Sequence, residues 1–380
     1  MVATWPVIHA TGPPADRGRA YGQQAADGIR RSVDIYTRVF RHYAGLEWYE
    51  VRDRARAFIE PIEGYDLSLL GELEGIAAGA GLDLEDVLAL NVRTEVMFGL
   101  GVALKECTAV VALPEATADG HTILAQNWDW KPEMRDTCVL LVSGPEDGPA
   151  FVTLVEAGLL AKTGMNEAGI GLCATALHSD RDQGKPGVPF HAILRRVLSC
   201  ESLGDAANAV MGCERSASAN YLIAHRDGEA LDLEVAPGDA SAAFPLWPSG
   251  GVLSHANHFQ SPRFPFVDTG LADGADSLVR QHRAEKALES KRGNVTVESV
   301  QKALRDHFDL PSSVCAHPDP AVEEIADYVT VSSVVMDLTE GTMWVSAGPP
   351  CEAEYVRHQG SDLFRDARPR QVQPRNHLRM

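Results

Sequence analysis

The chain has 380 residues, enough for one large domain or two ordinary ones, and its 45% hydrophobic and 23% charged residues are typical of a soluble globular protein. Its formal net charge of −19 argues against nucleic acids and anionic membranes as partners, because both are bound by clustered Lys and Arg. The first residues show neither the basic nor the apolar region of a signal peptide, and no apolar run is long enough to predict a membrane span. We therefore expect a cytoplasmic protein with reduced thiols.

The first third of the chain, residues 1–106, is predicted to be a mostly helical segment. Apolar residues recur at helical spacing over 23–43, and a second apolar face over 67–80 ends in a Gly-Ala-Gly run. A third helix is expected over 84–98, with Asp83 as its N-cap.

From residue 107 onward the pattern changes to short β-rich runs, and residues 107–358 are predicted to form the main domain. Strands are expected at 107–111, 121–130, 139–142, 151–155, 169–174, 219–224, 230–235, 251–254, 328–337 and 342–347. Helices are expected at 188–198, 202–211, 277–290 and 297–307. This order predicts an α+β domain in which helices cover two packed sheets. Residues 359–380 are rich in Arg, Pro and Asp and are expected to form a loose tail.

The seven cysteines lie far apart along the chain, at positions 107, 138, 173, 200, 213, 315 and 351. No Cys-x-x-Cys pair occurs, so the spacing predicts neither a zinc site nor a thioredoxin-like dithiol. Six of the cysteines are expected to be small buried hydrophobes. His255 and His258 are close together, but no further ligands accompany them, and no metal site is predicted there.

Cys107 differs from the other cysteines because it opens a predicted strand, and the cluster Gln126-Asn127-Trp128-Asp129 ends the next one. A thiol at this place can attack the carbonyl of Glu106 and move that acyl group from nitrogen to sulfur. Hydrolysis of the thioester then leaves Cys107 with a free α-amino group. Such an amine has a pKa of about 7.7–8.0, so one residue would supply both nucleophile and base.

Several short motifs around Cys107 occur in a characteristic order over roughly residues 10 to 350. They are Cys107-Thr108-Ala109 with Leu113-Pro114, Gln126-Asn127-Trp128-Asp129, Glu156-Ala157-Gly158, Gly164-Met165-Asn166-Glu167-Ala168-Gly169, Ala176-Leu177-His178, Gly187-Val188-Pro189 and His255-Ala256-Asn257-His258. In this ordered set the chain resembles the penicillin acyltransferase family, the acyl-coenzyme A:6-aminopenicillanic acid acyltransferases, which are N-terminal-nucleophile hydrolases. The resemblance implies a four-layer αββα sandwich with a helical N-terminal segment packed on it, and no cofactor.

The resemblance also implies roles for individual residues. Cys107 would be the autoproteolytic and catalytic nucleophile, and Asp129 would orient its new α-amino group. Asn257 would donate its side-chain N–H to the tetrahedral intermediate as part of an oxyanion hole. Ser218 matches a serine that lies near the nucleophile in the family.

Three positions depart from the family pattern. Glu106 stands where the fungal enzymes have Gly, and its bulk and charge would slow self-cleavage. An Arg that commonly follows the later cysteine is replaced here, because Cys315 is followed by Ala316 and His317. Thr175 occupies the position of an asparagine, which leaves the second oxyanion donor to a backbone N–H.

The expected function is therefore an amidohydrolase or acyltransferase that acts on a small N-acyl compound through a Cys107 acyl-thioester. Water as acceptor gives hydrolysis, and an amine acceptor or a separate acyl donor gives transfer. The acidic composition and the missing Arg disfavour a phosphate-bearing coenzyme A donor, so hydrolysis is favoured. The alternatives are an uncleaved, non-catalytic relative that binds a ligand or partner, and, with less support, a cysteine protease with a separate His base.

Overall fold

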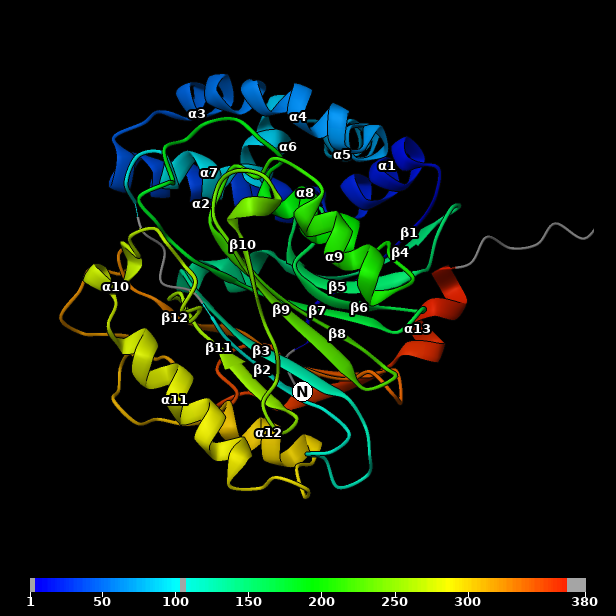
Figure 1. The fold of residues 1–380 in the computed structure, drawn as a ribbon. Coiled ribbons are helices and arrows are strands. Elements are labelled where there is room, and N and C mark those ends of the chain that lie inside the picture. Colours follow the sequence, from blue (N-terminus) through cyan, green and yellow to red (C-terminus); the bar gives the residue numbers. More distant parts are fainter. Residues whose placement is uncertain (1–3, 103–106, 368–380) are drawn as a thin grey trace, which may run out of the picture.

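The computed structural model describes residues 4–102 and 107–367, which form two β-sheets packed face to face between layers of helices (Figure 1). Strands β2 and β3 of one sheet contact β7 of the other, so the two sheets share the interior. Helices of the N-terminal third, joined by two helices between residues 190 and 211, cover the larger sheet, and the helices between residues 270 and 303 cover the smaller one (Figure 1). The fold is thus the four-layer αββα sandwich expected from the sequence.

The larger sheet has the strand order β1-β4-β5-β6-β7-β8-β9-β10. Its strands are β1 (Val7–Gly12), β4 (Cys138–Pro145), β5 (Phe151–Glu156), β6 (Thr163–Asn166), β7 (Ile170–Ala176), β8 (Ala219–His225), β9 (Glu229–Val235) and β10 (Ala243–Leu246). Only β1 pairs in parallel, with β4. The N-terminal segment therefore contributes a strand to the sheet as well as helices, which its helical periodicity did not predict.

The smaller sheet is antiparallel throughout, with the strand order β11-β2-β3-β12-β13-β14. Its strands are β2 (Thr108–Ala112), β3 (Ile123–Trp130), β11 (Val252–His255), β12 (Val329–Asp337), β13 (Thr342–Ser346) and β14 (Tyr355–Gln359). Every residue of β2, β3 and β12 is buried, because these strands lie between the other sheet and the helices beneath.

The helices of the first outer layer are α1 (Pro14–Gln24), α2 (Ala26–Ala44), α3 (Trp48–Ala55), α4 (Ile59–Tyr65), α5 (Leu67–Ala80), α6 (Leu84–Asn91), α7 (Arg93–Phe98), α8 (Phe190–Val197) and α9 (Leu203–Met211). The second layer contains α10 (Gly270–Asp273), α11 (Asp276–Glu289) and α12 (Val297–Ala303). Short 3₁₀ turns are η1 (Arg56–Phe58), η2 (Pro132–Thr137) and η3 (Ala240–Ala242). No helix within residues 4–102 and 107–367 has the length and apolar character that crossing a membrane requires.

Most predicted elements are confirmed, and two differences have clear causes. The helix expected over 84–98 is interrupted, because Val92 has non-helical dihedral angles between α6 and α7. The tail expected to be loose begins with a helix, α13 (Gly360–Ala367). Its residues Leu363 and Phe364 are buried, and the helix packs on β1, β4 and β5, so apolar burial orders this stretch. Residues 368–380 lie outside the described part.

Candidate active site

Cys107 lies at the head of β2, directly before Thr108, and only 2% of its surface is exposed. Its φ of 85° falls in the left-handed region, which residues other than glycine rarely adopt. Thr108 pairs with Asn127 across the hairpin, so the antiparallel register brings the start of β2 to the end of β3, where Asp129 lies. The hairpin joins the strands predicted at 107–111 and 121–130, and it places Cys107 and Asp129 together.

Asp129 accepts a hydrogen bond from the backbone N–H of Cys107. Its Oδ1 also accepts one from the Thr330 hydroxyl at 2.6 Å. Burial raises the pKa of Asp129 to about 6, although the Arg280 cation and these two hydrogen bonds oppose the rise. The carboxyl group is therefore directed at the nitrogen that would become the α-amino group if the chain were cut before Cys107.

Arg280, on α11, connects the two sides of the site and was missed by the sequence analysis. Its Nη1 donates to the Cys107 carbonyl at 2.7 Å and to the Thr108 hydroxyl at 3.0 Å, and its Nη2 donates to Asn257 Oδ1 at 2.9 Å. Its Nε donates to Asp276 at 3.0 Å, so all three nitrogens of this buried cation have a hydrogen-bond partner. The residue is one of several polar residues on a predicted helix, so no sequence signal distinguished it.

Asn257 follows β11 and is buried beside the head of β2. Because its Oδ1 accepts from Arg280, the amide orientation is fixed and its Nδ2 points to the opposite side, where it donates to the Ala176 carbonyl at 2.9 Å. Its backbone N–H donates to the Ser277 hydroxyl at 2.7 Å. The structure therefore brings Cys107, Asp129 and Asn257 into one network.

Thr175 and Ser218 lie at neighbouring ends of β7 and β8. The Thr175 hydroxyl donates to the Ala256 carbonyl at 2.6 Å, so it supports the segment that carries Asn257. The Ser218 hydroxyl lies 2.8 Å from that of Ser179, and its backbone N–H donates to a carboxylate oxygen of Asp182 at 2.8 Å. Both side chains hold loops at the edge of the site.

The two histidines of the segment around Asn257 have protein partners. His255 Nε2 lies 2.8 Å from Glu234, and His258 Nδ1 lies 2.8 Å from the Ser277 hydroxyl. Burial alone would lower the pKa of His255, but Asp232 and Glu234 hold it at about 9. Burial lowers the pKa of His258 to about 4. His255 is thus a buried cation paired with a carboxylate, which makes it unsuitable as a base at neutral pH.

Two predicted positions remain, His317 and Glu106. His317 Nε2 faces the thiols of Cys315 and Cys351, at 3.6 and 3.2 Å. Glu106 lies outside the described residues. A hollow of about 1150 Å³ opens between α4, α8 and α9, but none of the site residues lines it.

Replacing Asp129 with Asn tests the buried carboxyl group, in a Cys107→Ala background that keeps the chain in one piece. The folded pKa of about 6 lies above the usual 3.8, so the folded state holds its proton longer and stability falls as pH rises from 4 to 6. The shift corresponds to about 3 kcal/mol. We expect urea denaturation to show that Asp129→Asn removes this pH-dependent loss and makes the protein more stable at pH 7. Parallel stability-against-pH curves for the two proteins would contradict this account.

The αββα sandwich, with a buried cysteine at the head of an inner strand and a carboxyl group at its backbone nitrogen, defines the class of the N-terminal-nucleophile hydrolase fold. The model of the acyl-coenzyme A:6-aminopenicillanic acid acyl-transferase family matches residues 116–352, more than half of the chain. The chain therefore belongs to this family, as the sequence motifs predicted. The matched region includes Asp129 and Asn257 but begins after Cys107.

One curated relative agrees with this membership, and a second carries no described function. The chain is 27% identical over 311 residues to the 40 kDa form of acyl-coenzyme A:6-aminopenicillanic-acid-acyltransferase from Emericella nidulans, covering 81% of this chain and 84% of that protein. It is also 27% identical over 315 residues to an uncharacterized protein from Archaeoglobus fulgidus, covering 72% of this chain and 51% of that protein.

Solved structures give more distant likenesses. A variant of conjugated bile acid hydrolase from Clostridium perfringens aligns with a TM-score of 0.47 and 13% identity, over 67% of this chain and 93% of that one. Penicillin V acylase from Agrobacterium tumefaciens aligns with a TM-score of 0.37 and 14% identity, over 63% of this chain and 83% of that one. The family membership rests on the family model and the motifs and needs neither likeness.

Proposed function

We propose that this protein is a self-processing cysteine amidohydrolase of the penicillin acyltransferase family. It would cleave a small N-acyl amide through an acyl-thioester on Cys107. The observation that carries the proposal is the hydrogen bond from the Cys107 backbone N–H to Asp129, a buried carboxyl group placed to hold the α-amino group that cleavage would create.

Self-cleavage would begin when the Cys107 thiolate attacks the carbonyl carbon of Glu106. Nitrogen leaves carbon as the acyl group moves to sulfur, and the nitrogen takes up a proton. Water then hydrolyses the thioester, which gives Glu106 a carboxyl group and returns the thiol. The left-handed φ of Cys107 costs roughly 1–3 kcal/mol in an intact chain. Because φ requires the preceding carbonyl, cutting that bond removes the strain and favours the reaction.

Cleavage would also give the nucleophile its base. The Cys107 thiol is buried in the intact chain, and its backbone nitrogen is then part of an amide, which cannot take up the thiol proton. After the cut, the α-amino group takes the thiol proton and later gives it to the leaving amine. Arg280 holds the Cys107 carbonyl and the Asn257 amide at fixed positions, which prepares Asn257 to stabilise the oxyanion.

The acyl group then passes to water or to an amine. We favour water, because a coenzyme A donor would need cations for its phosphates, whereas the chain carries a net charge of −19 and has Ala316 in place of the common Arg. The relative from Emericella nidulans, by its name an acyltransferase of 6-aminopenicillanic acid, supplies the first class of N-acyl compound to try, the penicillins.

A partition experiment tests the preference for hydrolysis. Each N-acyl compound is incubated with the protein, with and without a millimolar amine acceptor, and the free acid and the acylated amine are quantified by mass spectrometry. We expect free acid to dominate in both conditions and Cys107→Ala to form neither product. Predominance of acylated amine would identify a transferase and overturn the preference.

A further inference from the structure

Four metal-ligating side chains from separate stretches of the chain meet beside the smaller sheet. His307 follows α12, Cys315 and His317 lie in the segment before β12, and Cys351 follows β13. His317 Nε2 lies 3.6 Å from Cys315 Sγ, 3.2 Å from Cys351 Sγ and 3.1 Å from His307 Nε2. The two sulfur atoms are 3.6 Å apart, and all four ligand atoms lie within 4.8 Å of one another.

Hydrogen bonds alone account poorly for this arrangement. A neutral imidazole nitrogen has one lone pair or one N–H, yet His317 Nε2 faces three polar atoms at once. The two Nε2 atoms also face each other, so one of them would have to be protonated. A cation at the centre removes the conflict, because each ligand then directs a lone pair inward.

We propose that His307, Cys315, His317 and Cys351 bind a Zn²⁺ ion in a closed Cys₂His₂ site. Tetrahedral zinc has bonds of about 2.3 Å to sulfur and 2.0–2.1 Å to nitrogen. Those bonds place two sulfurs about 3.8 Å apart, sulfur and nitrogen about 3.5 Å apart, and two nitrogens about 3.3 Å apart. In the structure the two sulfur atoms are 3.6 Å apart, the two sulfur–nitrogen distances to His317 are 3.6 and 3.2 Å, and the two nitrogen atoms are 3.1 Å apart. These distances follow the pattern expected for zinc.

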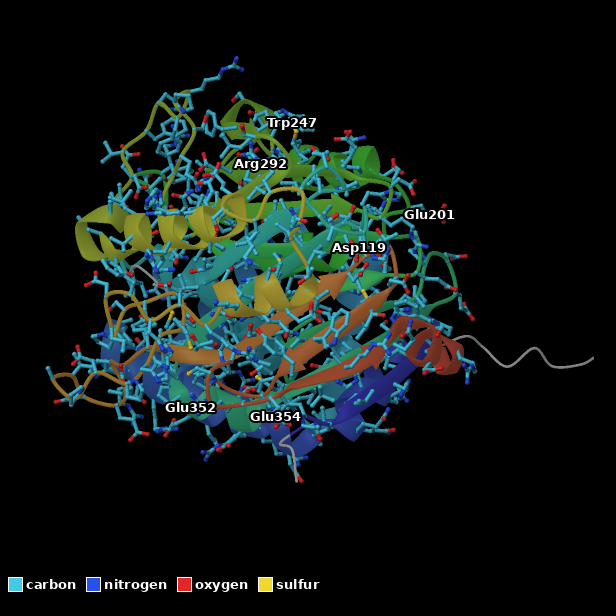
Figure 2. The ribbon with its side chains drawn as sticks, turned by 90° about the horizontal axis from the view of Figure 1, so that it is seen from below. Asp119, Glu201, Trp247, Arg292, Glu352 and Glu354 are labelled. Atoms are coloured by element: carbon cyan, nitrogen blue, oxygen red, sulfur yellow. The ribbon has the colours of Figure 1, made fainter. Side chains whose placement is uncertain are left out.

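A neighbouring carboxylate supports the site. His317 Nδ1 lies 3.4 Å from Glu352, whose side chain is exposed at the edge of the molecule (Figure 2). A carboxylate at Nδ1 keeps the proton on that nitrogen and leaves Nε2 as the ligand, which is the usual outer partner of a metal-bound histidine. Two thiolates and two neutral imidazoles favour zinc over the hard cations Mg²⁺ and Ca²⁺.

The proposed zinc site lies next to the hydrogen bonds that hold Asp129. Ala316 lies between the two ligands Cys315 and His317, and its backbone N–H donates to the Thr330 hydroxyl at 2.8 Å. That hydroxyl in turn donates to Asp129 at 2.6 Å. A bound ion would fix both neighbours of Ala316 and tie this segment to the turn that carries Cys351.

Metal analysis of the untagged full-length protein tests the proposal. After equilibration with Zn²⁺ and removal of excess metal, we expect about one zinc per wild-type chain and at least a tenfold lower content in the double variant Cys351→Ser/His307→Ala. Cys213→Ser is the matched control, because this half-buried cysteine lies outside the cluster and its variant should keep the full zinc content. Replacement of zinc by Co²⁺ in the wild-type chain should give the absorption of a tetrahedral thiolate site, a readout that needs no variant.

Two results would overturn the proposal. One is a wild-type protein that retains no more zinc than the double variant and gives no tetrahedral Co²⁺ spectrum. The other is an intact mass two hydrogens lighter, with Cys315 and Cys351 joined in a disulfide in freshly purified protein. Neither result bears on self-cleavage at Cys107, so the two proposals fail independently.

Discussion

Replacing Cys107 with Ala should leave the purified protein as one uncut chain of 380 residues without amidase activity. Alanine has no thiol to attack the Glu106 carbonyl and none to carry the acyl group, so both reactions stop together. Denaturing electrophoresis detects the cut, and release of free acid from an N-acyl substrate measures the activity.

Cys173→Ala is the control for this experiment. Cys173 is a second buried thiol. Burial raises the pKa of Cys173, and the nearby Cys107 adds to the rise. This variant should still cleave itself and hydrolyse substrate. A Cys107→Ala protein that is cut between residues 106 and 107, or that keeps its activity, would exclude Cys107 as the nucleophile.

Replacing Asn257 with Ala should lower kcat by roughly 10²–10³, which corresponds to about 2.7–4 kcal/mol of lost oxyanion stabilisation. KM should change little, because the interaction is strongest in the transition state. Steady-state kinetics on the cleaved fraction of the variant, quantified by mass spectrometry, separates this effect from a defect in self-cleavage.

Asn166→Ala is the matched control for Asn257, because Asn166 is also a buried asparagine whose amide donates to backbone carbonyls, those of Leu198 and Cys200. The Asn166→Ala change should reduce stability and leave kcat nearly unchanged. Equal kcat values for Asn257→Ala and wild type would remove Asn257 from the oxyanion hole.

Arg280→Lys should also lower kcat, because lysine cannot hold Cys107 and Asn257 with one planar group. The loss should be smaller than that of Asn257→Ala, because lysine keeps the positive charge and Asn257 is still present.

The local parts of the site could be predicted from the sequence. A short connection between two β-rich runs places the start of one strand beside the end of the next, as β2 and β3 are paired here. That Asp129 would serve the Cys107 nitrogen came from the family resemblance. Asn257 came from an ordered motif rather than from any local pattern. The layered α+β fold followed from the order of helical and strand periods, and the structure and family membership agree with it.

Contacts between residues far apart along the chain could not be predicted from the sequence. Arg280 is brought to Cys107 only when α11 packs against β2 and β11, and nothing in its neighbourhood along the chain marks it. Strand β1 was missed because its parallel pairing with β4 joins segments more than a hundred residues apart. The Cys₂His₂ cluster is likewise assembled from three separate stretches of the chain. It therefore has no local Cys-x-x-Cys motif by which the sequence could have indicated it.

Self-cleavage before Cys107 can be read from the intact mass of the purified wild-type protein. We expect two species, residues 1–106 and residues 107–380, with the second beginning at Cys107 and bearing a free α-amino group. Loss of both species in Cys107→Ala would show that the thiol makes the cut. A wild-type protein that stays at full length and deacylates no N-acyl amide would rule out self-cleavage and leave a non-catalytic binding protein as the better description.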